Sequence, residues 1–254
     1  MKQIALSVVM TVLMFGQGTQ AQEFSSEDLE RRTVHRRAVE AVIWGMPAVN
    51  YERMLQAAIA NGAKLNHVVY WSKPVNWKNQ TLTPNPDTIY LNPFYDTTAR
   101  PVVVEIPPAD ADHVIVGSFD VAWQNALADV GPAGADKGKG AKYLITPPGY
   151  KGKAPDGYIV LPSETYRGFV ILSSNFKSRS DADIKSAVEH GKRVKVYPLG
   201  GNPDSTVFVD AYDKPLTRRS GLGMSERNLE LYFHEAPAGI RPRATGPSTT
   251  PIGL

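Results

Sequence analysis

Short β-prone segments separated by glycine- and proline-containing turns dominate the chain from Leu65 onward, and they limit what it can fold into. The apolar pattern there changes from a period near 3.6 to a period near 2, which is typical of strands. Turn sequences such as 147–150 (Pro-Pro-Gly-Tyr) and 200–203 (Gly-Gly-Asn-Pro) lie between the segments. The pattern predicts an antiparallel β-sandwich, jelly-roll-like, rather than a wound parallel sheet. The predicted strands are Val68–Trp71, Val102–Ile106, His113–Phe119, Lys142–Thr146, Tyr158–Leu161, Tyr166–Ser173, Val194–Tyr197 and Thr206–Val209.

Helical patterns precede and interrupt these strands. Ser25 with Asp28 predicts a capped helix that ends at 45–47 (Gly-Met-Pro), and a second apolar stripe from Tyr51 to Ile59 predicts another helix. A further helix is expected from the cap at Ser180 to a glycine at 191. We therefore expect an α+β protein, with an N-terminal helical hairpin in residues 22–64 packed on a sandwich domain of residues 65–235 with one inserted helix.

The two ends of the sequence predict export and a disordered tail. Residues 1–21 have a basic start, an apolar core and a small-residue site, which is the pattern of a secretory signal cleaved after Ala21. We therefore expect a periplasmic or secreted protein. No later stretch approaches the roughly 20 apolar residues of a membrane span. Residues 225–235 predict a short last helix, and residues 236–254, rich in Pro, Gly and Thr, predict a disordered tail.

Composition narrows the classes of partner. The formal net charge is +3, from 28 basic and 25 acidic residues without a concentrated basic face, so we expect no nucleic-acid partner. The chain has no cysteine, which excludes disulfides and thiolate metal ligands. A small-molecule ligand remains the partner to consider, and the sequence does not fix an oligomeric state.

The first candidate site combines the segment from Asn66 to Trp71 with the run from Asn85 to Tyr90. Prolines at 84 and 86 push the residues before them out of the helical region, which aims the polar side chains there. Asp87 could act as a general base, while Asn66, Tyr70 and Asn85 contact a polar substrate. Alternatively, Asn85 and Asp87 form Asx turns that only hold the loop. The local sequence favours the second interpretation without excluding the first.

The second candidate is the polar and aromatic stretch from Asp120 to Asn125. Trp123 could be a stacking platform for a sugar or an aromatic compound, with Gln124 or Asn125 as a hydrogen-bonding group. The alternative is a tryptophan packed under a loop.

Phosphate and metal motifs are not matched. The glycine-rich segment 131–140 lacks the phosphate-loop pattern, which favours a flexible surface loop or lid. The five histidines (35, 67, 113, 190 and 234) lie far apart and form no H-E-x-x-H motif, so the spacing predicts no metal site and no cofactor. His67 or His113 could still meet Asp87 or Asp120 in the folded chain, which spacing cannot test.

Several of these segments together resemble the bacterial domain of unknown function 1254. The resemblance rests on 70–71 (Tyr-Trp), 84–90 (Pro-Asn-Pro-Asp-Thr-Ile-Tyr), 101–107 (Pro-Val-Val-Val-Glu-Ile-Pro), 120–125, 147–152 and 166–175, and it spans about residues 36–200. It implies a helical segment on a β-sandwich in a usually exported protein, and it brings no catalytic residues. Many members continue into a domain of unknown function 1214, which is not recognised in this sequence.

These features lead to two functional hypotheses. In the first, the exported domain binds or transforms a small organic molecule in a polar-aromatic pocket, with a hydrolase-like reaction because the sequence has no redox cofactor motif. In this hypothesis Asp87 is the catalytic base. The predicted substrate-binding residues are Asn66, Tyr70, Asn85, Trp123 and Asn125. The alternative is a non-catalytic periplasmic binding or assembly module.

Overall fold

The computed structural model describes residues 24–76 and 85–214 of the protein. The predicted signal peptide, last helix and tail lie outside the described residues. In chain order the elements are α2 (Ser26–Ala60), β1 (Val68–Tyr70), β2 (Thr88–Asp96), β3 (Val102–Ile106), β4 (Ile115–Val121), β5 (Ala126–Val130), β6 (Ala141–Thr146), β7 (Tyr158–Pro162), β8 (Arg167–Asn175), α3 (Asp181–Gly191), β9 (Lys195–Pro198), the short 3-10 helix η1 (Pro203–Ser205) and β10 (Phe208–Asp210).

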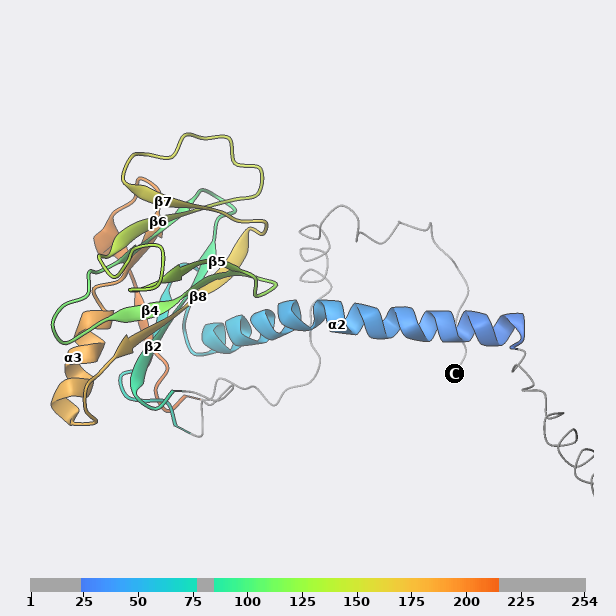
Figure 1. Ribbon diagram of the computed structural model, residues 1–254, viewed down its shortest axis with the longest axis horizontal. Coiled ribbons are helices and arrows are strands. Elements are labelled where there is room, and N and C mark those ends of the chain that lie inside the picture. Colours follow the sequence, from blue (N-terminus) through green and yellow to red (C-terminus); the bar gives the residue numbers. More distant parts are fainter. Residues whose placement is uncertain (1–23, 77–84, 215–254) are drawn as a thin grey trace, which may run out of the picture. The chain divides into compact units, whose positions relative to one another are not determined.

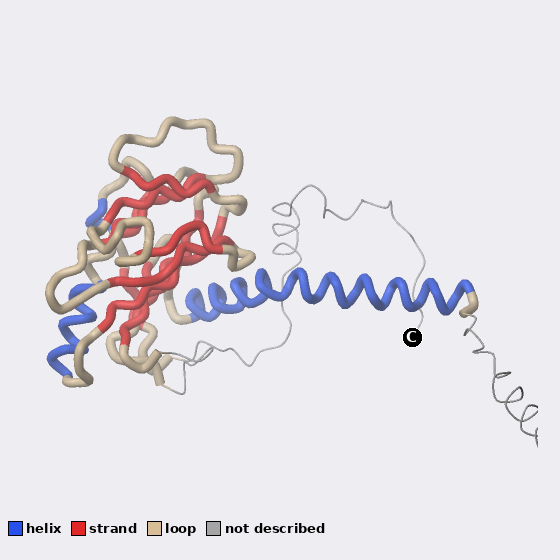
Figure 2. The backbone as a smooth tube through the Cα atoms, in the orientation of Figure 1, coloured by secondary structure: helices blue, strands red, loops and turns tan. Residues whose placement is uncertain are grey.

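The strands form two sheets. The larger has the order β10-β1-β2-β8-β4-β5 and the smaller the order β7-β6-β3-β9, and Figure 2 shows both in red. The pairs β1/β10 and β6/β7 are parallel, so both sheets are mixed. The predicted α+β class is confirmed, but the predicted purely antiparallel arrangement is wrong, and a jelly roll would require it.

The main core lies between the two sheets. Phe119 on β4 and Tyr143 on β6 are fully buried, with ring centroids 4.5 Å apart. On β3, Val102 and Val104 face this core, whereas Val103 packs on the other side of the smaller sheet. The three successive valines are therefore buried on alternate faces, which is the pattern of a central strand.

The other face of the larger sheet is covered by the second half of α2. Tyr51, Leu55 and Ala58 form a buried cluster there with side chains of β2 and β8. The ring centroid of Tyr51 lies 5.9 Å from that of Phe169. Gln124, which has a positive φ, donates from Nε2 to the carbonyl of Pro47 at 2.9 Å.

The predicted helical hairpin is replaced by one helix, α2, which contains Pro47 (Figure 1). An interior proline costs roughly 3 kcal/mol, because its ring displaces a hydrogen bond of the preceding turn. The burial of Tyr51, Leu55 and Ala58 against the sheet offsets that cost. The sequence pattern at residues 45–47 was therefore a misleading stop signal.

The chain divides into two compact units, residues 1–44 and 45–254. In the first unit, Asp28 N donates to Ser25 Oγ at 3.0 Å, which confirms the predicted helix cap. Val39, Val42 and Ile43 of this unit are exposed.

Two strands were not predicted from the sequence. β2 begins inside the proline-rich run and contains Pro93, which pairs with Val68 of β1. The sequence around Pro93 reads as a loop, because proline gives no ladder donor. β5 is the last strand of its sheet, and only Val130 among its residues is buried. It contains two alanines and an aspartate, so its sequence carries little β signal.

α3 packs against β2 and β8 (Figure 1). Its predicted cap is confirmed, since Asp183 N donates to Ser180 Oγ at 3.2 Å. Ser174 Oγ on β8 donates to the carbonyl of Ala187 at 2.8 Å. A Cβ at Gly191 would lie 2.9 Å from Leu91 Cδ1, so the last turn of α3 approaches β2 closely. Neither α2 nor α3, the two α-helices of residues 24–76 and 85–214, has the length and hydropathy of a membrane span.

Candidate functional site

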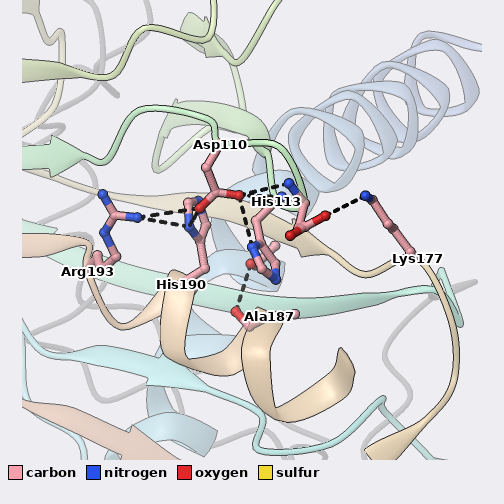
Figure 3. Close-up of polar contacts among 8 residues, drawn as sticks. Asp110, His113, Lys177, Ala187, His190 and Arg193 are labelled. Atoms are coloured by element: carbon pink, nitrogen blue, oxygen red, sulfur yellow. Dashed lines mark hydrogen bonds and ion pairs between the residues drawn. The ribbon is translucent and has the colours of Figure 1, made fainter. Parts of the chain in front are cut away.

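Asp110, His113 and His190 form a cluster between the loop after β3 and the last turn of α3 (Figure 3). His113 Nδ1 lies 3.0 Å from Asp110 Oδ1, and His190 Nδ1 lies 3.3 Å from Asp110 Oδ2. The two imidazole rings stack with centroids 5.1 Å apart and an angle of 19° between their planes. Two segments far apart in sequence thus meet at one carboxylate.

The Asp110 carboxylate is held in an ionised form. Its Oδ1 accepts the backbone N–H groups of Asp112 at 3.0 Å and His113 at 2.8 Å. These bonds, first that from Asp112, lower the pKa of Asp110 to about 2, against a smaller opposing effect of burial. At neutral pH, Asp110 is therefore an anion that faces both imidazoles.

His190 is the most buried member of the cluster. Its side chain is 2% exposed, and burial lowers its pKa despite the neighbouring carboxylate. Its Nδ1 lies between Asp110 Oδ2 and Arg193, whose Nη1 is 3.3 Å away. Among the described residues, its Nε2 has no hydrogen-bond partner. The imidazole of His190 is therefore neutral at physiological pH.

A cavity of about 170 Å³ adjoins His113. Lys177 and Asp112 form an ion pair at its wall, and this contact raises the pKa of Lys177. The cavity could hold a molecule of a few heavy atoms, since a water molecule occupies roughly 30 Å³. Its lining residues are Asp112, His113, Phe176, Lys177, Asp183 and Ser186.

The arrangement of Asp110 and His113 suits proton transfer. A neutral His113 that donates Nδ1–H to Asp110 has its lone pair on Nε2. The ring lines the cavity, and its side chain remains 14% exposed. A carboxylate that fixes the tautomer of a histidine beside a cavity is the arrangement of a general base.

Asn85 and Asp87 of the predicted site lie in the turn before β2. Asn85 Oδ1 accepts the N–H of Asp87 at 2.9 Å, and Asn85 N donates to Tyr90 Oη at 2.9 Å. The carboxylate of Asp87 is exposed and pairs with Arg179 at 3.0 Å. Asn85 thus forms an Asx turn, as in the structural alternative, and the catalytic role of Asp87 stays a prediction.

The other predicted site residues are distributed over both faces of the larger sheet. Asn66, with a φ of 65°, accepts from Asp96 N at 2.9 Å and so fastens the end of β2. Tyr70 belongs to the core between the sheets, whereas Trp123 packs on the cluster under α2. Asn125 is exposed, and its carbonyl accepts from Val121 N at 3.0 Å. Tyr70 and Trp123 therefore face different parts of the molecule, and their ligand contacts stay predictions.

The glycine-rich segment 131–140 is organised by Asp136. This buried carboxylate accepts from Gly131 N at 2.8 Å and from Gly140 N at 3.3 Å. The loop thus turns its N–H groups toward its own aspartate, which occupies the position that a phosphate would need.

Asp120, at the start of the second predicted constellation, is buried at the end of β4. Burial raises its pKa, and Ser118, whose Oγ donates to Oδ2 at 2.7 Å, opposes the shift. A raised folded-state pKa means that folding favours the protonated form. The associated stability is present below the unfolded pKa of about 3.9 and is lost as the pH rises through the folded value.

Asp120→Asn is therefore expected to raise the Tm at pH 7, because asparagine keeps an acceptor for Ser118 without a buried charge. The gain should disappear near pH 3, where the native carboxyl is itself neutral. Thermal unfolding followed by circular dichroism between pH 3 and 8 measures both values. Asp156→Asn, which removes an exposed carboxylate in the loop before β7, is the control, and a gain that does not depend on pH would contradict the explanation.

The sequence reasoning missed this cluster for a topological reason. His113 was considered as a partner of Asp87 or Asp120, but its partner is Asp110, three residues earlier. His190 is 77 positions further along the chain, and only the packing of α3 against β2 and β8 brings it to the same carboxylate. The usable signal was the Asp-x-x-His spacing at residues 110–113 directly before a predicted strand.

Comparisons with known proteins give a family and a fold. The family model described as "Protein of unknown function (DUF1254)" matches residues 65–198, a range that contains Asp110, His113 and His190. The crystal structure of the VPA0106 protein from Vibrio parahaemolyticus is similar, with 19% sequence identity and a TM-score of 0.52. The match covers 76% of this chain and 44% of that one, so the chain spans less than half the length of that protein. No curated protein matches the sequence.

Proposed function

Since this chain belongs to the DUF1254 family, whose function is unknown, we propose a function from the site itself. The domain binds a small polar organic molecule in the cavity beside His113 and transforms it by general-base catalysis. The observation that carries this proposal is the bond between His113 Nδ1 and Asp110, made by a ring that also lines the cavity. The resemblance predicted from the sequence is confirmed at the level of the family, which brings no activity with it.

The reaction that fits best is a hydrolase-like one. His113 Nε2 takes a proton from a water molecule as the water oxygen attacks an ester or amide carbon of the bound molecule. The same proton then passes from His113 to the leaving oxygen or nitrogen as its bond to that carbon breaks. Asp110 stabilises the imidazolium that exists between the two steps.

A non-catalytic binding or assembly module is the second candidate. The observation in its favour is that the Asp110 carboxylate already accepts two backbone N–H groups and faces two imidazoles and Arg193. With so many donors around it, this carboxylate also suits a purely structural role, in which it fastens the loop to α3. The two candidates differ in one measurement, because only the enzyme consumes its ligand.

The run of residues 84–90 is an alternative location for the site. Asp87 remains a candidate base in the signature run, with its carboxylate exposed beside Arg179. A polar substrate there would meet Asn85, and the sequence predicts Asn66, Tyr70, Trp123 and Asn125 as further contacts. We also propose that the protein is periplasmic or secreted, on the basis of the signal pattern in residues 1–21 alone.

The proposal is tested by filling the cavity. Ser186 lies on α3 at the cavity wall, so Ser186→Phe should abolish the Tm increase caused by ligands found in a thermal-shift screen of small esters, amides and polar acids. A ligand at 100 times its Kd stabilises the native state by about 2.7 kcal/mol, which is readily detected.

Ala182→Phe provides the matched control, since it adds the same ring to an exposed position of the same helix. That variant should keep the full ligand-induced shift. If Ser186→Phe also keeps the shift, the ligand binds elsewhere and the proposed site is wrong.

A further inference from the structure

The Nδ1 atom of His190 has two neighbours that make opposite demands. Arg193 Nη1, at 3.3 Å, can only donate, so it requires a lone pair on Nδ1. The ionised Asp110 Oδ2, also at 3.3 Å, can only accept, so it requires a hydrogen there. Either tautomer of a neutral imidazole therefore leaves one of the two contacts unfavourable.

A metal cation would remove this conflict. It accepts the lone pair of Nδ1 and attracts the carboxylate at the same time, provided that Arg193 moves away. The side chain of Arg193 is half exposed and 3.7 Å from Asp110, so it can rotate into solvent without losing a buried position.

The distances suit a transition-metal ion. Tetrahedral zinc with bonds of about 2.0–2.1 Å separates its ligand atoms by roughly 3.3 Å. Asp110 Oδ1 is 3.0 Å from His113 Nδ1, and Asp110 Oδ2 is 3.3 Å from His190 Nδ1. One ligand atom of each residue lies within 4.8 Å of the others. Two imidazoles and one carboxylate favour Zn²⁺, Co²⁺ or Ni²⁺ over Mg²⁺ or Ca²⁺.

We infer that Asp110, His113 and His190 form a binding site for a divalent transition-metal ion of the zinc type, with Arg193 as the competing cation. A bound ion would be coordinated by the Nδ1 lone pair of His113 and by the Asp110 carboxylate. The ion therefore excludes the tautomer in which His113 Nε2 is basic. This last consequence, inhibition by the ion, rests on the proposed function, whereas the metal site itself does not.

The test uses the untagged full chain, freed of metal with a chelator and titrated with CoCl₂ and ZnCl₂. Cobalt binding is followed by its visible absorption bands and zinc binding by calorimetry. We expect one ion per chain at the cluster, and an affinity about tenfold weaker or worse in His190→Gln and His113→Gln. The site would be overturned if both variants bound the ions as tightly as the native chain does. It would also be overturned if the native chain bound no ion.

Arg193→Gln makes the test independent of any loss of folding, because it should tighten binding. Removal of a cation so close to the ion should raise the zinc affinity by about tenfold. An unchanged or weaker affinity in this variant would contradict the competition. His35→Gln, an exposed position on α2, should bind as the native chain does.

The two proposals fail separately. If zinc binds as expected and slows turnover of the ligand, both stand. If zinc binds and turnover increases with occupancy, the metal site stands and the general-base function of His113 is wrong.

Discussion

His113→Gln is expected to lower the turnover of a bound substrate by about 10²–10⁴-fold, the range that a positioned general base contributes. Glutamine keeps a polar group near Asp110, but it has no basic nitrogen to take a proton from water. Binding should change little, because the cavity retains Lys177, Asp112 and Ser186. Compounds that bind in the thermal-shift screen are offered as substrates, and mass spectrometry measures the product that forms.

Asp87→Asn, measured beside His113→Gln, distinguishes the two candidate bases. If His113 is the base, Asp87→Asn leaves turnover within about twofold of the native value, since it alters only an exposed pair with Arg179. The opposite result, with turnover lost in Asp87→Asn and kept in His113→Gln, would move the site to the signature run. A ligand that neither the native chain nor either variant consumes would support the non-catalytic module.

Phe119→Ala should produce the largest loss of stability, about 3–5 kcal/mol in the free energy of unfolding. The ring of Phe119 is fully buried between the sheets and lies 4.5 Å from the ring centroid of Tyr143. Its removal leaves a cavity between the two sheets, because the other buried side chains of this core keep the sheets apart. Urea denaturation followed by fluorescence and circular dichroism measures the change.

Val160→Ala is the corresponding control on β7. This side chain is 41% exposed, and its truncation should change the free energy of unfolding by no more than about 0.5 kcal/mol. A loss at Phe119 below 1 kcal/mol would mean that the sheets are not held together by the core described here.

Local sequence patterns predicted the elements whose stability is local. β3 was predicted at its observed residues, because three valines and an isoleucine favour a strand and the flanking prolines mark its ends. The cap of α3 at Ser180 was also found, since the donor and acceptor lie three residues apart. The family was recognised from the proline-rich run at 84–90 together with the other segments named above.

Features that depend on tertiary contacts were mispredicted. The stop signal at residues 45–47 is overridden by burial of the following helical turns on the sheet. β2 carries a proline that a central strand normally excludes, yet it pairs with β1 and β8 on its two sides. The parallel pairs β1/β10 and β6/β7 join segments whose partners no local pattern specifies.

The candidate site shows the same division. Asn85 and Asp87 attract attention in the sequence because prolines surround them, and prolines shape loops whether or not the loop has a function. The cluster at Asp110 has no such mark. Its residues meet because the loop before β4 and the last turn of α3 both lie near one end of β8, which is a property of the fold rather than of any segment.

The pairing of β10 with β1 also has a consequence for how the family domain should be delimited. The matched range ends at residue 198, before β10, and begins at residue 65, after α2. A polypeptide cut at those limits would expose the backbone edge of β1 and the apolar face around Phe94 and Phe169. Unpaired edges and uncovered apolar faces promote aggregation. We therefore expect the smallest stable unit to extend beyond the matched range on both sides, from the second half of α2 through β10.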